Sequence, residues 1–285
     1  MTVYAVTGAS GPFGHHVVEG LLEAGVPASD IVAVVRTPGK VADLAARDVQ
    51  VREADYDRAD SLPPAFAGVD VLMFVSGSQA GSRVPQHKRV VEAALQAGVG
   101  RVVYTSILRA DTTRIVLAAE HKATEEMLIG SGIPYTFLRN SWYLDNYTGQ
   151  LPDYLERGEI VGAAGDGRVS AAPRGDYAAA AVTTLTTPGH ENAVYELGGP
   201  GFTMAELART ITDVTGVEVV YRNLTVPEFV AHLEEVGLPG ATATFVAALD
   251  EALARGDLET SDAGLVRLIG RPVTSLADAV RAATA

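Results

Sequence analysis

The sequence predicts an α/β protein of the Rossmann type, with a doubly wound parallel sheet and a smaller C-terminal α/β lobe. The chain opens on a short apolar run that stops at a glycine-spaced turn and continues as an amphipathic segment. Apolar runs of strand length then alternate with helical segments as far as about residue 138, which is the pattern of βαβ units. With 285 residues, 47% of them hydrophobic, the chain can bury one large core.

Six strands are predicted in the N-terminal half, with helices between them. The run at 31–35 is apolar throughout, as expected for a strand that is buried on both faces of a parallel sheet. Helices are predicted after the glycine turn as far as Gly25, from Pro38 with Thr37 as its cap, and over 85–97 and 113–130. The predicted strands are 3–6, 31–35, 49–51 with Ala54, 69–75, 101–105 and 134–138.

The alternation changes after Arg139. We therefore divide the chain into a nucleotide-binding domain, 1–139, and a smaller substrate lobe, 140–285, that is interleaved with returning core elements. The spacings Thr203/Glu206 and Thr225/Glu228 predict capping boxes at two helix starts. Asp176 is expected to cap an alanine-rich helix. The glycine-containing segment 160–170 is predicted to form a hairpin turn, with a second phosphate loop as the alternative.

The composition excludes several classes of protein. A formal charge of −13 disfavours a nucleic-acid partner, because no broad basic face would neutralise phosphates. The absence of cysteine excludes disulfides, thiolate nucleophiles and Cys-ligated metals. The Asp, Glu and His residues lack ligand spacing, so we predict no metal. No apolar run has membrane-spanning length, and we expect a cytoplasmic monomer or homodimer.

The turn from Gly8 to Gly14 has the chemistry of a phosphate-binding loop. Gly8 and Gly11 would let backbone amides approach a pyrophosphate that a Cβ would hold off. Pro12 suits the first turn of the helix, whose free amides and dipole favour an anion. A turn and helix with no ligand is the alternative, because the spacing is G-x-x-G-x-x-G and not G-x-G-x-x-G.

The end of the second predicted strand indicates which dinucleotide would bind. NAD sites place an acidic residue there for the ribose hydroxyls, whereas NADP sites place a cation for the 2′-phosphate. This strand ends at Arg36 and contains no Asp or Glu. We therefore predict NADPH, with NADH binding more weakly; the alternative is a solvated surface arginine. Nothing in the sequence indicates a flavin, so we expect direct hydride transfer from the nicotinamide.

The motif Tyr-x-x-x-Lys, in which the ammonium lowers the pKa of the phenol, is absent. Arg36, Val84 and Ala118 stand four residues before the three lysines. The substrate must then accept a hydride without a dedicated acid. A quinone fits, because the hydroquinone anion is stabilised by its ring and can take a proton from water.

Several motifs together carry a resemblance to the NmrA-like atypical short-chain dehydrogenases. Within these, the chain is most similar to the bacterial NAD(P)H:quinone oxidoreductases of type 2, with triphenylmethane reductase a near relative. Among the motifs are Gly8-Ala9-Ser10-Gly11-Pro12-Phe13-Gly14, Val34-Val35-Arg36, Ala54-Asp55-Tyr56, Tyr104-Thr105-Ser106, Glu120-His121 with Thr124-Glu125, and Leu138-Arg139-Asn140-Ser141-Trp142-Tyr143.

This resemblance implies roles for individual residues. Arg36 would bind the 2′-phosphate, and Asn140 to Asn146 would lie between the nicotinamide and the substrate. The chain departs from the family at Ser10 and Pro12, where Thr and Gln are frequent, and at Lys122, where the quinone reductases often have an apolar residue. The residues implied at the cofactor are Gly8, Ser10, Gly11, Pro12, Phe13 and Gly14 at the pyrophosphate, Ser76, Gly77 and Ser78 at the nicotinamide ribose, and Asn140, Trp142, Tyr143 and Asn146 in the cleft.

Three residues are candidates for catalysis. His121 could protonate a reduced quinone oxygen, or it could be a helix-surface histidine paired with Glu125. Asn140 could bind the carboxamide or a substrate carbonyl, or cap its own turn. Tyr143, with Trp142, could stack on a quinone ring or only cover the core. Gln86 and His87 are interpreted as surface residues, with the expected cleft beside them.

The predicted function is NADPH-dependent two-electron reduction of quinones or similar planar conjugated acceptors, without flavin. The first alternative is an NADP-sensing regulatory protein of the NmrA type that binds the cofactor but performs no turnover. The second alternative is a reductase of triphenylmethane-type cationic dyes.

Overall fold

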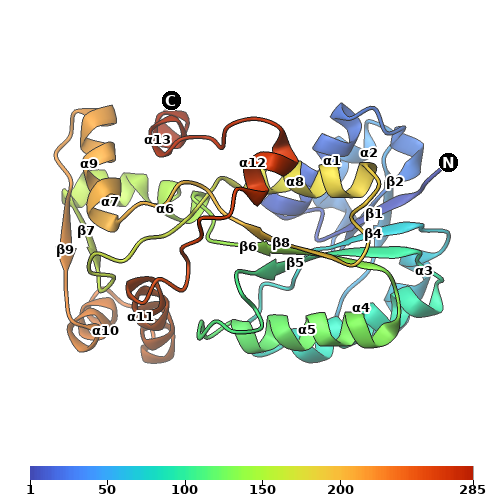
Figure 1. Ribbon diagram of the computed structural model, residues 1–285, viewed down its shortest axis with the longest axis horizontal. Helices are drawn as coiled ribbons and strands as arrows, with labels where there is room; N and C mark the ends of the chain where they lie inside the picture. Colours follow the sequence, from blue (N-terminus) through green and yellow to red (C-terminus); the bar gives the residue numbers. More distant parts are fainter. Residues whose placement is uncertain (285) are drawn as a thin grey trace.

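The computed structural model describes residues 1–284 and shows a parallel seven-stranded sheet with helices on both faces (Figure 1). The strand order is β3-β2-β1-β4-β5-β6-β8. The chain leaves β1 toward one edge and returns to build the other edge from β4, so the order reverses between β1 and β4. In sheets of this kind, ligands bind beyond the carboxyl ends of the strands at such a reversal. The strands are β1 Tyr4–Thr7, β2 Ile31–Val35, β3 Gln50–Glu53, β4 Val71–Phe74, β5 Arg101–Ile107, β6 Tyr135–Asn140 and β8 Ala193–Leu197.

Two helical layers cover this sheet (Figure 1). The first buries the face that carries Val6 and Met73, and the second buries the face that carries Ala5 and Leu72. Alternate residues of a strand point to opposite faces, so apolar strands supply both cores. The first layer contains α1 Pro12–Glu23, α2 Ala42–Ala45, α8 Arg174–Thr186 and α12 Gly264–Ile269, and the second contains α3 Leu62–Phe66, α4 Arg83–Gln96 and α5 Ala118–Ser131.

The remaining elements form a smaller lobe at the carboxyl ends of β5, β6 and β8 (Figure 1). Most of them share a third apolar core that includes Leu151, Phe202 and Ile211, while the helix that carries Phe229 packs in a smaller cluster with Ala247. The elements are α6 Asp145–Thr148, α7 Leu151–Arg157, β7 Glu159–Gly162, α9 Met204–Thr215, β9 Val220–Asn223, α10 Val226–Glu235, α11 Gly240–Ala254 and α13 Leu276–Thr284. Among residues 1–284, no helix is long and apolar enough to cross a membrane.

The predicted fold class is confirmed, and all six predicted strands lie in the large sheet. The helices α8 and α12 and the strand β8 follow residue 139 but pack on or in this sheet. They are the returning elements that the sequence indicated. The division into domains at residue 139 stays a prediction. Both capping boxes are formed, with Thr203 and Thr225 each accepting a hydrogen bond from the glutamate amide three residues on.

The hairpin predicted over 160–170 is wrong. β7 pairs in parallel with β9, which follows it by some sixty residues, so no local pattern could reveal the partner. The amides after β7 are also occupied, since Ala163 N donates to Asp250 Oδ2 at 2.7 Å, and Ala164 N donates to Tyr221 Oη at 2.9 Å. These bonds leave the segment unsuited to the alternative of a phosphate loop.

Asp176 does not cap α8, which begins two residues earlier with Pro173 at the cap position. Its buried carboxylate accepts hydrogen bonds from Thr274 N at 2.8 Å and Arg271 Nη2 at 2.5 Å. Asp176 thus attaches the C-terminal segment to α8. The predicted cap at Thr37 is also absent, because Pro38–Val41 forms a short 3-10 helix without a side-chain cap.

Candidate active site

A cleft of about 370 Å³ opens where the strand order reverses. The turn after β1 and the loop after β4 form two of its walls. The end of β2 forms a third. Its lining includes every residue that the sequence predicted for the pyrophosphate, the 2′-phosphate and the nicotinamide ribose. The lining residues are Gly8, Ser10, Gly11, Pro12, Phe13, Gly14, Val34, Val35, Arg36, Lys40, Ala54, Asp55, Tyr56, Val75, Ser76, Gly77, Ser78, Gln79, Gln86 and Arg174.

The turn after β1 is closed by backbone contacts that require glycine. Gly8 has a φ of +60°, and its carbonyl accepts the Gly11 amide at 2.9 Å. A Cβ on Gly14 would lie 2.5 Å from the Gly8 carbonyl oxygen. The amides of Phe13 and Gly14 have no backbone partner among the described residues. Two free donors at the start of a twelve-residue helix suit a pyrophosphate.

Two cations stand beyond the end of β2, at the wall of the cleft. The side chains of Arg36 and Lys40 are exposed and have no hydrogen bond or ion pair among the described residues. A dianionic 2′-phosphate would find two charges there and no competing carboxylate at the strand end. Arg36 was predicted from its position after the strand. Lys40 was missed because it lies in a short 3-10 helix, Pro38–Val41, whose direction the sequence does not show.

Arg174, at the start of α8, also lines the cleft, although the sequence did not predict it. Its Nη2 donates to Asn146 Oδ1 at 2.7 Å, and its guanidinium carbon lies 4.7 Å from the centroid of the Tyr143 ring. Asp145 adds an ion pair at 3.5 Å. The predicted residues Tyr143 and Asn146 therefore lie behind Arg174 and do not line the cleft themselves.

Asn140 and Trp142 are also set back from the cleft. Trp142 packs partly buried against the core of the small lobe. Asn140 is 3% exposed at the end of β6, and neither atom of its amide has a hydrogen-bond partner among the described residues. Burial raises the pKa of the Tyr143 phenol, which the nearby Asn140 amide and Arg174 oppose. The amide influences this phenol without making a hydrogen bond of normal geometry.

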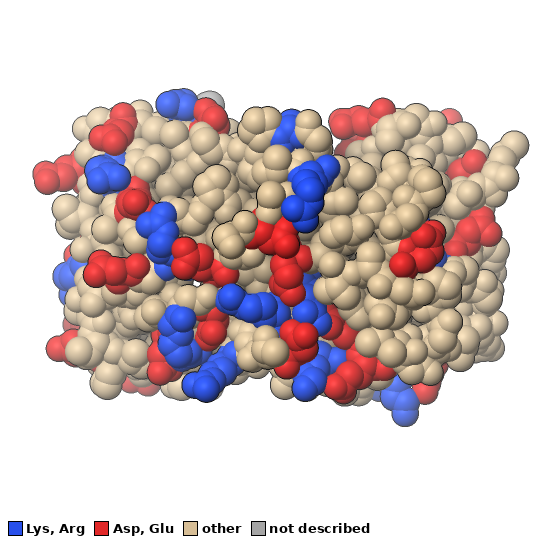
Figure 2. All heavy atoms as spheres, in the orientation of Figure 1, with Lys and Arg blue, Asp and Glu red and all other residues tan. Residues whose placement is uncertain are grey.

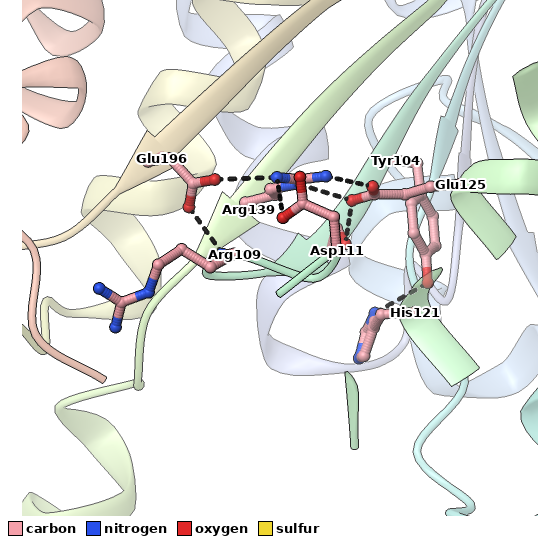
Figure 3. Close-up of polar contacts among 8 residues, drawn as sticks. Tyr104, Arg109, Asp111, His121, Glu125, Arg139 and Glu196 are labelled. Carbon is pink, nitrogen blue, oxygen red and sulfur yellow. Dashed lines mark hydrogen bonds and ion pairs between the residues drawn. The ribbon is translucent and has the colours of Figure 1, made fainter. Parts of the chain in front are cut away.

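His121 is a core residue, and its predicted surface pairing with Glu125 is wrong. It is 5% exposed, lies outside the lining of the cleft, and its Nδ1 is 2.9 Å from Tyr104 Oη (Figure 3). Burial, reinforced by the Arg83 charge, lowers the pKa of His121 to about 3. It is therefore neutral near pH 7. The interpretation of Gln86 and His87 as surface residues is wrong too, since both are buried and Gln86 lines the cleft.

Glu125 instead belongs to a buried ion-pair network centred on Arg139 (Figure 3). Arg139 donates through Nε and Nη2 to the two oxygens of Glu125, at 2.9 and 2.6 Å. Its Nη1 reaches Asp111 and Glu196, each at 3.0 Å. These pairs raise the pKa of Arg139, opposed by burial. The network joins β6, β8, α5 and the loop after β5 at the carboxyl edge of the sheet.

The acidic chain offers one group of metal-ligand type among residues 1–284, formed by His15, Glu19 and Asp43. Arg47 Nη1 donates to both Glu19 oxygens, at 2.7 and 2.5 Å, so a cation already neutralises that carboxylate. On the face drawn in Figure 2, acidic and basic side chains are interspersed.

The fold and the cleft define a dinucleotide-binding protein of the Rossmann type. Comparison with known proteins identifies the group more closely. The chain belongs to the NAD(P)H-binding, NmrA-like family: the model of an NAD(P)H-binding family matches residues 8–188.

Individual relatives match the chain over nearly its full length. Quinone oxidoreductase 2 of Escherichia coli K12 is 47% identical over 277 residues, which cover 97% of this chain and 96% of that protein. The crystal structure of the E. coli enzyme complexed with NADPH superimposes with a TM-score of 0.96, at 46% identity, over 99% of this chain and 100% of that one. Citrobacter sp. triphenylmethane reductase complexed with NADP(H) gives a TM-score of 0.93 at 40% identity, over 98% and 99% of the two chains.

The close approach within the phosphate turn yields a first prediction. Gly14→Ala forces the Gly8 carbonyl or α1 to move, and we expect it to lower the free energy of unfolding by about 1–3 kcal/mol. Urea denaturation measures this difference. Gly39→Ala is the matched control, because a Cβ there would meet nothing within 4 Å. Equal stability of the two variants would contradict the geometry of the turn.

The buried neutral imidazole of His121 yields a second prediction, on pH. Its pKa in the folded protein, about 3, is below the value of about 6.5 in an unfolded chain. Its contribution to stability is therefore complete above pH 6.5 and is lost as the pH falls toward 3. Between pH 7 and pH 5, the wild type should lose about 2 kcal/mol more unfolding free energy than His121→Gln.

Denaturant titrations at the two pH values measure this loss. The control is His16→Gln, which removes an exposed imidazole and should behave as the wild type does. The same pH dependence in wild type and His121→Gln would contradict the buried, neutral state of His121.

Proposed function

We propose that this chain is an NADPH-dependent reductase that passes a hydride directly to quinones or similar planar conjugated acceptors. The observation that carries the proposal is the cleft itself, which combines a turn with free amides and two unpaired cations beyond the end of β2. The 47% identity to E. coli quinone oxidoreductase 2 over nearly the whole chain supports the acceptor class.

The residues of the chain would bind and orient the cofactor. The Phe13 and Gly14 amides would hold the pyrophosphate, and Arg36 and Lys40 would hold the 2′-phosphate. Ser76 and Ser78, which line the cleft, would contact the nicotinamide ribose. Bound NADPH supplies the hydride, so the protein contributes position and a place for negative charge.

The acceptor would lie beyond the nicotinamide, toward Asn140 and Tyr143. Asn140 carries a buried amide without a partner, and such a group costs about 1–3 kcal/mol unless something satisfies it. We propose that it binds the nicotinamide carboxamide or an acceptor carbonyl once Tyr143 and Arg174 shift. His121 is neutral, buried and not among the residues that line the cleft, so we assign it no proton transfer; a reduced quinone takes its proton from water.

Two other functions keep the same cofactor site. Reduction of cationic triphenylmethane dyes is favoured by the likeness to the Citrobacter enzyme. A regulatory protein that senses NADP(H) without turnover would also need the cleft, but it would not reduce any acceptor.

One assay separates these functions. Loss of NADPH absorbance at 340 nm is followed with a small benzoquinone or naphthoquinone, on protein shown to contain no flavin, and the direct chemical reaction is subtracted. The proposal expects turnover with quinones. Turnover with malachite-green-like dyes but not with quinones would show that the chain is a dye reductase. Tight NADPH binding without turnover of either acceptor would favour the regulatory protein.

Arg36, which has no ion-pair partner after β2, yields a third prediction, which concerns the choice of cofactor. Arg36→Asp replaces attraction of the 2′-phosphate by repulsion, and we expect the KM for NADPH to rise about 10- to 100-fold. The KM for NADH should change less than about threefold, because NADH lacks that phosphate. Arg281→Asp is the charge-matched control, since Arg281 is exposed on α13 and pairs with Asp278. Equal responses of the two cofactors would contradict the role of Arg36.

A further inference from the structure

The loop after β4 lines the cleft, but it is held from outside the cleft by three side chains. Ser76 N donates to Thr105 Oγ1 at 2.8 Å. Gly77 N donates to His87 Nε2 at 2.9 Å, and Arg83 Nε donates to the Gly77 carbonyl at 2.5 Å. Both polar groups of the Gly77 backbone therefore bond to α4.

The hydrogen bonds define the tautomer of His87. Its Nε2 accepts the Gly77 amide and so carries no proton, which places the proton on Nδ1. Nδ1 lies 2.8 Å from Thr124 Oγ1, whose own hydrogen goes to the Glu120 carbonyl at 2.8 Å. The imidazole is fully buried, and burial lowers the pKa of His87 to about 3. At neutral pH, Nε2 therefore stays unprotonated and continues to accept the hydrogen bond from the Gly77 amide.

Arg83, the second α4 residue that bonds to Gly77, is itself held by an ion pair. It is buried at the start of α4, and its Nη1 pairs with Glu120 Oε2 at 3.1 Å. Glu120 Oε1 accepts the amides of Gly81 and Arg83, at 2.9 and 3.3 Å. One carboxylate of α5 thus holds both Arg83 and the far end of the loop. The segment 76–83 is thus attached to β5 at Ser76, to α4 at Gly77 and to α5 at Gly81.

This arrangement determines what the loop offers to a ligand. The amide and carbonyl of Gly77 are used by His87 and Arg83. The Ser76 and Ser78 hydroxyls have no hydrogen-bond partner within residues 1–284, and both residues line the cleft. These two hydroxyls are therefore free to bind a ligand. A loop fixed in advance costs less conformational entropy when it binds.

We propose that His87 and Arg83 are positioning residues that clamp the Gly77 backbone and hold the Ser76–Ser78 loop in the conformation that binds NADPH. The inference rests on the proposed function for the identity of the cofactor. Neither residue touches the cofactor in this account. Their effect passes through one peptide segment of the loop.

The test compares two substitutions of His87. His87→Gln places an amide oxygen where Nε2 accepts the Gly77 amide, whereas His87→Leu leaves that amide without an acceptor. We expect the Kd for NADPH, measured by fluorescence titration without any acceptor, to rise about tenfold in the Leu variant. In the Gln variant it should stay within about threefold of the wild type.

Leu185→Ala is the control for an effect on NADPH binding that comes from lower stability alone. Leu185 is buried, and its carbonyl accepts a hydrogen bond from the Arg101 side chain at the amino end of β5. The cleft lies at the other end of the strands, beyond their carboxyl ends. This variant should lower the Tm and leave the Kd for NADPH unchanged. If His87→Leu does not fold, Arg83→Met tests the other half of the clamp, with the same expected rise in Kd.

A second readout follows the imidazole directly. Long-range ¹H–¹⁵N NMR should show His87 with an unprotonated Nε2 and a protonated Nδ1, unchanged between pH 8 and pH 5.5. NADPH binding in His87→Leu within twofold of the wild type, or the opposite tautomer, would overturn the clamp. If the wild type binds NADPH but reduces no quinone while the Kd pattern holds, the proposed function fails and the clamp stands.

Discussion

The close approach of α1 to the turn after β1 is the constraint on which the rest of the site depends. The Gly8 carbonyl occupies the place that a Cβ on Gly14 would need. At the next contact of α1, a Cβ on Gly20 would lie 2.8 Å from Val182 on α8. Because both positions are glycine, α1 can pack closely against the turn after β1 and against α8. Its first free amides then face the cleft where the strand order reverses.

Around this turn, polar groups divide according to the side they face. Most of those set back from the cleft are paired, as in the Arg139 network and in the bonds from His87 and Arg83 to Gly77; the buried Asn140 amide is an exception. Among the groups that line the cleft, the amides of the turn and the side chains of Arg36 and Lys40 are free, whereas Arg174 is paired. Buried polar groups are expensive unless they are satisfied. The hydrogen bonds behind the Gly77 loop therefore fix one wall of the cleft, and the free groups of the cleft suit a polyanionic ligand.

The parts of this account that came from the sequence depend on local chemistry. Apolar runs predicted the strands, the glycine spacing predicted the turn, and Arg36 followed from its place after β2. The sequence could not show what depends on contacts between distant segments. Arg174 reaches the cleft from α8, β7 finds its partner in β9, and His87 turns inward because Gly77 needs an acceptor. The same holds for His121. Its helical spacing to Glu125 suggested a pair on the surface, but the Glu125 carboxylate is buried and bonds to Arg139.

The central claim is that the cleft holds NADPH so that its hydride passes directly to the acceptor. A single-turnover stopped-flow experiment tests it most directly, on flavin-free protein with NADPH deuterated at one or the other face of nicotinamide C4 and a naphthoquinone as acceptor. We expect a primary isotope effect on the oxidation of NADPH for deuterium at one face of the nicotinamide only, because a fixed cleft presents one face to the acceptor. Oxidation that requires added flavin, or that shows no isotope effect with either face, would contradict it.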